Sequence, residues 1–484
     1  MPAVSMCTER AQQLGAPFAP LPRVLWIELT SKCPFDCVFC SRRLRRGAGI
    51  HMDMALYRRI VGALQAPEII RLNYSGESTH HPHIVEAIRL AAATGATTEL
   101  VTALGSLPDR MVEPLAGSGL DRLTVSLHTL DPQQFEAIYG HSSVDAVRRK
   151  AAALVAARDR AGLRRPLLDL AVVAMRRNLG QLLPLASFAK QIGATGLAIH
   201  PVIRRDPTPD DFVEELDGDK LRPGFLAELA QAIAEVRRLH PDLPLSVSTP
   251  ELDATRCLGD RPAPFPGRLP DGARIHSCDQ NPWDTVHILA DGSVVTCEVR
   301  DRSALGRIAA DADAPALCDI WRGPAYAEFR EQYRAGAVAE CRDCPYKTAF
   351  VPAEPVAAID LSAGIHAQLL HGWHPPDGSP FLWAKRIAAL ELARPAGSRS
   401  LHVEGWVPAL AGSVRVQIDG VAVGELRTTG TAGGSVQADL PLPESDRNMA
   451  TVVLQTDRPL VPSRVGLGSD VRELGFGLRR IALR

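Results

Sequence analysis

The sequence predicts an α/β fold, a partial (β/α)6 barrel, followed by a small α+β domain and a C-terminal all-β sandwich. Three observations predict this architecture. Apolar strand-like runs alternate with helix-like segments through the first half of the chain. Short strand-like stretches with well-spaced cysteines extend from Cys257 to Cys344. Alternating apolar and polar residues dominate after Phe381, as in half-buried strands.

The predicted barrel strands are runs rich in β-branched and other apolar residues, as buried parallel strands are. They are Val24–Leu29, Ile69–Asn73, Thr98–Thr102, Arg122–Leu127, Leu167–Val173 and Gly196–His200. Segments with apolar positions at helical spacing separate most of them: His83–Ala93, Asp109–Leu115, Asp131–Tyr139, Ser143–Arg160 and Leu179–Ile192. About six such βα units imply a parallel sheet closed or half closed into a barrel, whose functional residues gather at the carboxyl ends of its strands.

The predicted domain boundaries follow changes in this pattern. We expect an N-terminal extension at 1–22, the barrel at 23–250, the α+β domain at 251–350, a connector at 351–380 and the sandwich at 381–484. In the last region, Asp419-Gly420 follows an alternating strand and predicts a tight hairpin turn.

Composition narrows the class of protein. A length of 484 residues suggests several domains, and 46% hydrophobic with 23% charged residues is typical of a globular protein. The net charge of −1 gives no electrostatic case for binding nucleic acid or an anionic membrane. The sequence shows neither an export signal nor an apolar run of the ~20 residues that span a membrane. The 10 cysteines therefore indicate metal ligation in a reducing cytoplasm.

Three cysteines, Cys33, Cys37 and Cys40, follow the first predicted strand with CxxxCxxC spacing. Three thiolates on one loop can hold three irons of a cubane iron–sulfur cluster and leave the fourth iron open, whereas an electron-transfer ferredoxin supplies a fourth cysteine. A structural zinc site is the alternative, but it usually needs four ligands and no neighbouring residue completes one.

This strand and loop, with Phe39 just before the last cysteine, resemble the radical S-adenosylmethionine (SAM) superfamily. The resemblance implies a 4Fe-4S cluster whose open iron is chelated by SAM, and one-electron cleavage of SAM to a 5′-deoxyadenosyl radical. It also implies that Phe39 contacts the cofactor.

Further residues resemble the SAM-binding positions of that family, in the expected order. Ser75-Gly76-Glu77 follows the second strand and is similar to the Gly-Gly-Glu-Pro motif that holds the SAM amino group, with Ser75 in place of the first glycine. Ser126 ends the fourth strand, where the family contacts the ribose. The resemblance also places two polar residues after the fifth strand near the SAM carboxylate, Arg176 and Asn178.

A second set of cysteines, Cys278, Cys297, Cys341 and Cys344, resembles the twitch/SPASM extension of radical SAM enzymes. No cysteine follows Cys344, so the match is to the shorter form with one auxiliary 4Fe-4S cluster. Four cysteines leave no open iron, which favours electron transfer. A zinc ribbon with four cysteine ligands is the alternative, but it usually pairs two CxxC knuckles and only one is present.

Candidate catalytic residues are less sharply indicated. His128 and His200 lie at predicted strand ends and are candidates to remove a proton from a substrate radical, although each also suits a hydrogen-bonded scaffold role. Cys257 is either a hydrogen-atom donor, a spare ligand or a buried thiol.

Three functions compete at this point. The main hypothesis is oxidation or epimerisation of a carbohydrate-type small molecule, with the auxiliary cluster as electron acceptor. It is favoured by the single auxiliary cluster, by the few residues before Val24, and by a modest likeness of the C-terminal region to sandwich domains of saccharide-assembly proteins. The alternatives are maturation of a ribosomal peptide, the commoner role of SPASM enzymes, and a non-catalytic saccharide-binding protein.

The predicted partners are a small-molecule substrate and an external one-electron reductant such as flavodoxin or ferredoxin. Tryptophans of the C-terminal region are candidates to stack on sugar rings, but in a small sandwich they are more often core residues.

Overall fold

The structure is a computed structural model. It describes residues 21–40, 42, 48–64, 67–140, 143–202, 218–247, 258–265, 267–298, 303–311, 315–344, 346–428, 433–462, 465–467, 470 and 472–484. No helix within these ranges is both long and apolar enough to cross a membrane. The chain divides into two compact units: a barrel unit, Leu21–Thr249 with Thr285–Trp321, and a C-terminal unit, Pro250–Asp284 with Arg322–Arg484.

The barrel unit is built on a sheet with the strand order β12-β11-β10-β1-β2-β3-β4-β5-β6-β7. Its parallel strands along the first part of the chain are β1 (Val24–Ile27), β2 (Ile69–Arg71), β3 (Thr97–Thr102), β4 (Arg122–Ser126), β5 (Leu167–Ala174), β6 (Gly196–Pro201) and β7 (Leu245–Val247). The predicted partial barrel is confirmed, and each predicted strand is present with its ends shifted by a few residues.

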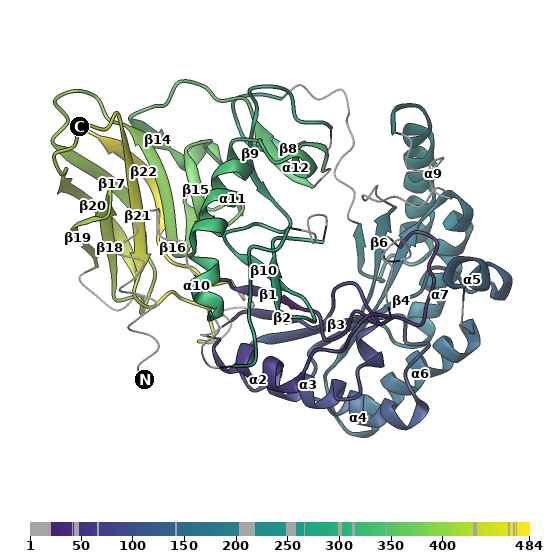
Figure 1. The fold of residues 1–484 in the computed structure, drawn as a ribbon. Helices are drawn as coiled ribbons and strands as arrows, with labels where there is room; N and C mark the ends of the chain where they lie inside the picture. Colours follow the sequence, from purple (N-terminus) through teal and green to yellow (C-terminus); the bar gives the residue numbers. More distant parts are fainter. Residues whose placement is uncertain are drawn as a thin grey trace. The chain divides into compact units, whose positions relative to one another are not determined.

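Helices follow most of these strands: α2 (Met54–Gly62), α3 (Ile84–Ala92), α4 (Val112–Ala116), α5 (Pro132–Tyr139), α6 (Val144–Arg160), α7 (Leu182–Gln191) and α9 (Gly218–Leu239). Figure 1 shows α2, α3, α4 and α6 along one side of the sheet. Alternate strand residues such as Leu100 and Leu123 are fully buried or nearly so. The residues between them form a more open face, on which Arg71 pairs with Glu99 at 2.7 Å.

One part of this sheet was not foreseen. β10 (Thr285–Ile288) runs parallel to β1 on the side away from β2, and β11 (Ser293–Val295) and β12 (Gly306–Arg307) continue the sheet in antiparallel fashion. Asp291 and Gly292 form the turn between β10 and β11, with Gly292 at φ 87°. Pairing between residues about 260 positions apart leaves no local pattern in the sequence.

The C-terminal unit begins with a small three-stranded sheet of order β8-β13-β9, formed by Ala263–Pro264, Lys347–Phe350 and Arg274–Cys278. Helices α11 (Pro324–Arg334) and α12 (Ala339–Asp343) belong to the same unit, whereas the short α10 (Leu317–Trp321) belongs to the barrel unit. The predicted limits of the α+β domain stay a prediction.

The rest of this unit is a nine-stranded antiparallel arrangement with the path β19-β18-β21-β16-β22-β17-β20. Its strands are β16 (Leu382–Ala393), β17 (Ser400–Val407), β18 (Ser413–Ile418), β19 (Val421–Arg427), β20 (Gly434–Pro441), β21 (Met449–Thr456) and β22 (Gly477–Leu483), with β14 (Ala358–Asp360) and β15 (Leu369–Trp373) attached. The segment predicted as a connector thus contributes two strands, β14 and β15, which pair with β22 and β16.

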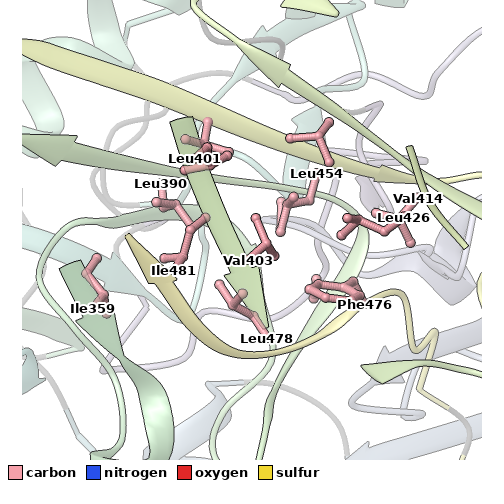
Figure 2. Close-up of a cluster of buried hydrophobic side chains, with 14 of the residues drawn as sticks. Ile359, Leu390, Leu401, Val403, Val414, Leu426, Leu454, Phe476, Leu478 and Ile481 are labelled. Atoms are coloured by element: carbon pink, nitrogen blue, oxygen red, sulfur yellow. The ribbon is translucent and has the colours of Figure 1, made fainter. Parts of the chain in front are cut away.

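Two sheets meet in this region because β16 pairs with strands of both. Its first residues pair with β22, and Ile387–Ala393 pair with β21. Apolar side chains from both sheets form one buried cluster, which Figure 2 shows with Val403 and Ile481 facing Leu454 and Val414. The predicted all-β sandwich and its Asp419-Gly420 hairpin, with φ of 52° and 83°, are confirmed.

Replacing Leu454 tests whether this shared core stabilises the sandwich. Leu454 is 1% exposed, so Leu454→Ala should lower the free energy of unfolding by about 2–5 kcal/mol through lost burial and a cavity. Hydrogen-exchange mass spectrometry of β16 and β21 amides measures the change. The matched control Val421→Ala, at a residue 52% exposed, should change it by less than about 0.5 kcal/mol. Equal effects of the two variants would contradict a shared core.

Candidate active site and iron–sulfur sites

The first cysteine loop leaves the carboxyl end of β1 and is fixed against α5. Asp36 N–H donates to Tyr139 O at 2.9 Å, and Val38 N–H donates to Ile138 O at 3.0 Å. Cys33, Cys37 and Cys40 are all half-buried free thiols on this loop. The barrel unit therefore holds the three predicted ligands together where a parallel α/β barrel places its functional groups.

Two thiols on this loop, those of Cys33 and Cys37, are held in a setting that disfavours bare thiolates. Burial raises the pKa of Cys33 to about 11 and, together with the neighbouring cysteine charges, raises the pKa of Cys37. A thiolate becomes stable in such surroundings when it coordinates a cationic metal centre. The donor set fits an iron–sulfur cluster with one open iron.

The loop that follows β2 packs directly on the cysteine loop. A Cβ atom at Gly76 would lie 2.0 Å from Thr30 O and 2.7 Å from Lys32 O, so only glycine fits. Glu77 N–H donates to Lys32 O at 2.9 Å. Ser75, Gly76 and Glu77 thus lie beside the cluster ligands, as the resemblance implied, although their contacts with SAM stay a prediction.

The carboxylate oxygens of Glu77 accept hydrogen bonds mainly from groups of the protein itself. Its Oε1 accepts from Thr79 N–H, Thr79 Oγ1 and Thr102 Oγ1, and its Oε2 accepts from Ala103 N–H at 2.8 Å. The side chain is 4% exposed. This geometry makes Glu77 a brace between the loop after β2 and the end of β3, with one Oε2 lone pair left for a SAM ammonium.

A second buried carboxylate, Glu28, holds the other side of this loop. Glu28 Oε1 accepts from Ser75 N–H and from the Ser75 hydroxyl, and Oε2 accepts from Ala290 N–H at 3.0 Å. Glu28 therefore joins the ends of β1 and β10 to the predicted SAM-binding loop. Sequence reasoning missed it, because the only local signal was an acidic residue at the end of an apolar strand.

Some residues predicted around the ends of β4 and β5 lie where they can contact SAM, whereas others are hydrogen-bonded to the scaffold. Ser126 is half-buried at the end of β4, and its carbonyl accepts from Tyr139 Oη at 2.8 Å. Phe39 packs edge-on against the His128 ring, with 4.9 Å between ring centroids. Both lie where a nucleoside could be bound from the cysteine loop and β4, but those contacts stay predictions.

His128 and Asn178 serve the scaffold instead. His128 Nδ1 accepts from Val173 N–H at 3.1 Å, and burial lowers the pKa of His128 to about 3. The neutral ring has its proton on Nε2 and no lone pair left, so the predicted role of His128 as a base is not supported. Asn178 is fully buried, donates to His128 O and Val173 O, and accepts from Met175 N–H, which ties β4 to β5.

The remaining candidates in this region lie apart from that scaffold. Arg176 is 41% exposed and pairs with Glu228 of α9 at 3.7 Å. His200 is the penultimate residue of β6 and is exposed on the open face; partial desolvation of its ring lowers its pKa, and the charge of Glu298 partly opposes that shift. Glu298, next to Cys297, was not among the predicted site residues. Cys257 lies outside the described residues.

The second cysteine set is divided between the units. Cys278, at the end of β9, and Cys341 and Cys344, around α12, lie in the C-terminal unit, and all three are half-buried. Their charges all act on one buried side chain, Tyr333 of α11, and raise its pKa together with burial. The C-terminal unit therefore gathers three of the four predicted ligands.

Cys297 follows β11 in the barrel unit. Its carbonyl accepts from the Tyr74 hydroxyl at 3.2 Å, which connects it to the residue before Ser75. Its role as the fourth ligand stays a prediction.

Two buried polar groups beside the three cysteines fit a negatively charged cluster. The Tyr333 hydroxyl lies beside Cys278 and has no further hydrogen-bond partner within the described residues. Lys347 of β13 is 2% exposed and near Cys344 and Cys341; burial lowers its pKa to about 8. A buried hydroxyl and a buried ammonium both suit thiolate and sulfide acceptors.

Within the described ranges, no three His, Cys, Asp or Glu side chains converge on one point as ligands of a single metal ion. Ligands of a cubane bind different irons, so they stand farther apart than ligands of one ion.

Two family models match the chain in the regions that carry these cysteines. The radical SAM superfamily model matches residues 27–161, and the model of the SPASM iron–sulfur cluster-binding domain matches residues 278–345. The barrel and its cysteine loop thus define a radical SAM domain. The chain thus carries a radical SAM domain and a SPASM-type cluster-binding domain.

Curated relatives resemble the chain to different extents. A tungsten-containing aldehyde ferredoxin oxidoreductase cofactor-modifying protein of Pyrococcus furiosus is 23% identical over 75% of this chain and 96% of its own length. A PqqA peptide cyclase of Ruegeria pomeroyi is 31% identical over 37% of this chain, which spans about half (47%) of that relative.

Among solved structures, SuiB of Streptococcus suis bound to S-adenosylmethionine matches with a TM-score of 0.51 and 16% identity, over 68% of this chain and 72% of SuiB. This likeness supports the fold. The predicted cofactors, SAM and two 4Fe-4S clusters, are those of the radical SAM and SPASM domains.

Gly76→Ala tests the contact between the two loops. Because the added Cβ would overlap Thr30 O, the loops must separate, and SAM affinity should fall at least tenfold. Equilibrium dialysis of the reconstituted protein measures this, with iron content as a check on the cluster. Gly62→Ala is the control, since a Cβ there meets nothing within 4 Å. Unchanged SAM affinity in Gly76→Ala would show that the packing is not needed for binding.

Glu28→Gln tests the brace between β1, β10 and the loop. A glutamine places an NH2 group against one of the N–H donors that Glu28 now accepts from, which costs about 1–3 kcal/mol of stability. We expect a lower melting temperature and weaker SAM binding. The control Glu86→Gln alters an exposed carboxylate paired with Arg58 and should leave both measurements unchanged.

Proposed function

We propose that this enzyme modifies a peptide by radical chemistry that begins with SAM cleavage. When bound, the first cluster would supply the electron for cleavage of SAM to a 5′-deoxyadenosyl radical, and the auxiliary cluster would serve as an electron acceptor. The observation that carries the proposal is the packing of the Cys33, Cys37 and Cys40 loop on the Gly76 loop at the carboxyl ends of β1 and β2.

The chain's own residues would bind and orient the reactants. The loop from Ser75 to Glu77 would receive the SAM amino group, and Phe39, held by His128, would pack against the nucleoside. Four cysteines would ligate the auxiliary cluster: Cys278, Cys297, Cys341 and Cys344.

A proton must also leave the substrate when its radical is oxidised. His200 is the candidate acceptor on the open face of the sheet, because a lowered pKa keeps its imidazole neutral and able to take a proton. An external one-electron reductant such as flavodoxin or ferredoxin would reduce the first cluster.

The likeness to PqqA peptide cyclases supports a peptide substrate. Carbohydrate oxidation, the main hypothesis from the sequence, has no support from the relatives named above. The SAM-binding fold also argues against a purely non-catalytic binding protein.

Deuterium transfer distinguishes these functions. The reconstituted, reduced enzyme is incubated with SAM and an extract of cells grown in deuterated medium, and deuterium in 5′-deoxyadenosine is measured by mass spectrometry. For a peptide substrate, protease treatment of the extract should abolish deuterium transfer and periodate treatment should not. The reverse pattern would indicate a carbohydrate, and absence of SAM cleavage would contradict an enzymatic role.

The two cysteine sets should have separable roles. Cys33→Ala/Cys37→Ala/Cys40→Ala should abolish 5′-deoxyadenosine formation. Cys278→Ala/Cys341→Ala/Cys344→Ala should retain SAM cleavage but lose substrate turnover, and each triple variant should lose about four irons per chain. Product analysis with parallel iron assays measures both. Equal loss of SAM cleavage in the two variants would contradict a separate auxiliary site.

A further inference from the structure

Lys347 is a buried cation without a carboxylate partner. The residue is 2% exposed in β13, and its ammonium donates to two neutral acceptors, Gly267 O and Cys344 O, the latter at 2.8 Å. The Phe265 ring lies 5.4 Å away and adds a weak attraction. Within the described residues, Lys347 forms no salt bridge with Asp or Glu.

The one carboxylate with an electrostatic effect on Lys347 among the described residues is paired elsewhere. Asp343 acts electrostatically on Lys347, but its side chain is 61% exposed and lies 3.8 Å from Arg268. An exposed carboxylate screened by water compensates a buried charge poorly. Burying an ammonium costs several kcal/mol unless an opposite charge lies close by. The burial of the Lys347 ammonium is therefore compensated only when another negative charge lies close to it.

The groups that can supply this charge are the cysteines on the same side. Cys344 and Cys341 are the cysteines that act on Lys347, and Cys344 also contributes its carbonyl. The Tyr333 residue is 2% exposed, and its hydroxyl lies beside Cys278 without a further hydrogen-bond partner within the described residues. Two donors of different chemistry thus face one set of thiols.

We propose that Lys347 is the buried counter-charge of the auxiliary cluster and that, with the Tyr333 hydroxyl, it raises the reduction potential of that cluster. The inference rests on the proposed auxiliary cluster at Cys278, Cys341 and Cys344. A cluster ligated by cysteine thiolates is negative and gains one more negative charge on reduction. A fixed cation and a hydrogen-bond donor stabilise the reduced state more than the oxidised state, so the cluster becomes a better electron acceptor.

Reduction potentials measured on the full-length protein test this role. The protein carries Cys33→Ala/Cys37→Ala/Cys40→Ala, so that only the auxiliary cluster gives an EPR signal. Lys347→Met should lower the midpoint potential by at least ~59 mV, a tenfold change in the ratio of reduced to oxidised cluster for a one-electron couple. Lys347→Arg should retain most of the potential, and Tyr333→Phe should lower it by less than Lys347→Met.

Lys190→Met is the charge control, because it removes an exposed cation that pairs with Asp242 on the surface of the barrel unit. It should leave the potential unchanged. An unchanged potential in Lys347→Met with full iron content would overturn the proposal. Loss of the cluster in Lys347→Met but not in Lys347→Arg would support the proposal, because arginine keeps the positive charge and methionine removes it. Loss in both variants would overturn it and assign Lys347 to packing.

Thermal unfolding of the apoprotein gives a second readout that needs no cluster. Without a counter-charge, the buried ammonium destabilises the fold, so Lys347→Met should raise the melting temperature of the apoprotein. It should not raise that of the loaded protein. A wild-type protein that binds only about four irons per chain would instead show that the auxiliary cluster is absent, which refutes the proposed function and not merely this inference.

Discussion

The barrel unit depends on the close approach of two loops at the carboxyl ends of β1 and β2. Gly76 lies so near Thr30 O and Lys32 O that no side chain fits between them. Two buried carboxylates hold this contact from opposite sides, since Glu28 accepts from Ser75 and Glu77 accepts from Thr102 and Ala103. The three cysteines are consequently presented by a braced loop, and their spacing in the sequence becomes a fixed arrangement in space.

Local patterns in the sequence were sufficient for the barrel and for the three-cysteine loop that follows its first strand. Strands such as Leu167–Val173 carry their own apolar signal, and the CxxxCxxC spacing places three thiols on one loop whatever surrounds them. The Asp419-Gly420 turn was predictable for the same reason, because both residues tolerate positive φ and do adopt it. These features depend on residues close together in the chain.

Features that depend on distant residues escaped prediction. β10 joins the sheet through pairs such as Trp26 with His287, and Glu28 acquires its structural role only through Ala290. His128 was a candidate base or a scaffold residue from its place at a strand end, and only the contact with Val173 N–H, which occupies its lone pair, favours the scaffold role. Whether a polar side chain binds a ligand or the scaffold depends on which hydrogen-bond donors the fold brings to it. Those donors come from distant parts of the chain, so the residues next to the side chain in the sequence do not reveal them.

The buried polar groups discussed above therefore differ in how far the protein itself compensates their burial. Glu28, Glu77 and Asn178 have protein partners for their hydrogen bonds, so their burial is compensated and they serve the fold. Lys347 and Tyr333 differ, because a buried ammonium with only neutral acceptors and a buried hydroxyl without a normal hydrogen bond are costly in the protein alone. Both lie beside cysteines, and the same cost disappears when those cysteines carry an anionic cluster. An incompletely compensated pair of this kind is thus better evidence for a bound group than the cysteine spacing by itself, because a purely structural thiol cluster would need neither donor.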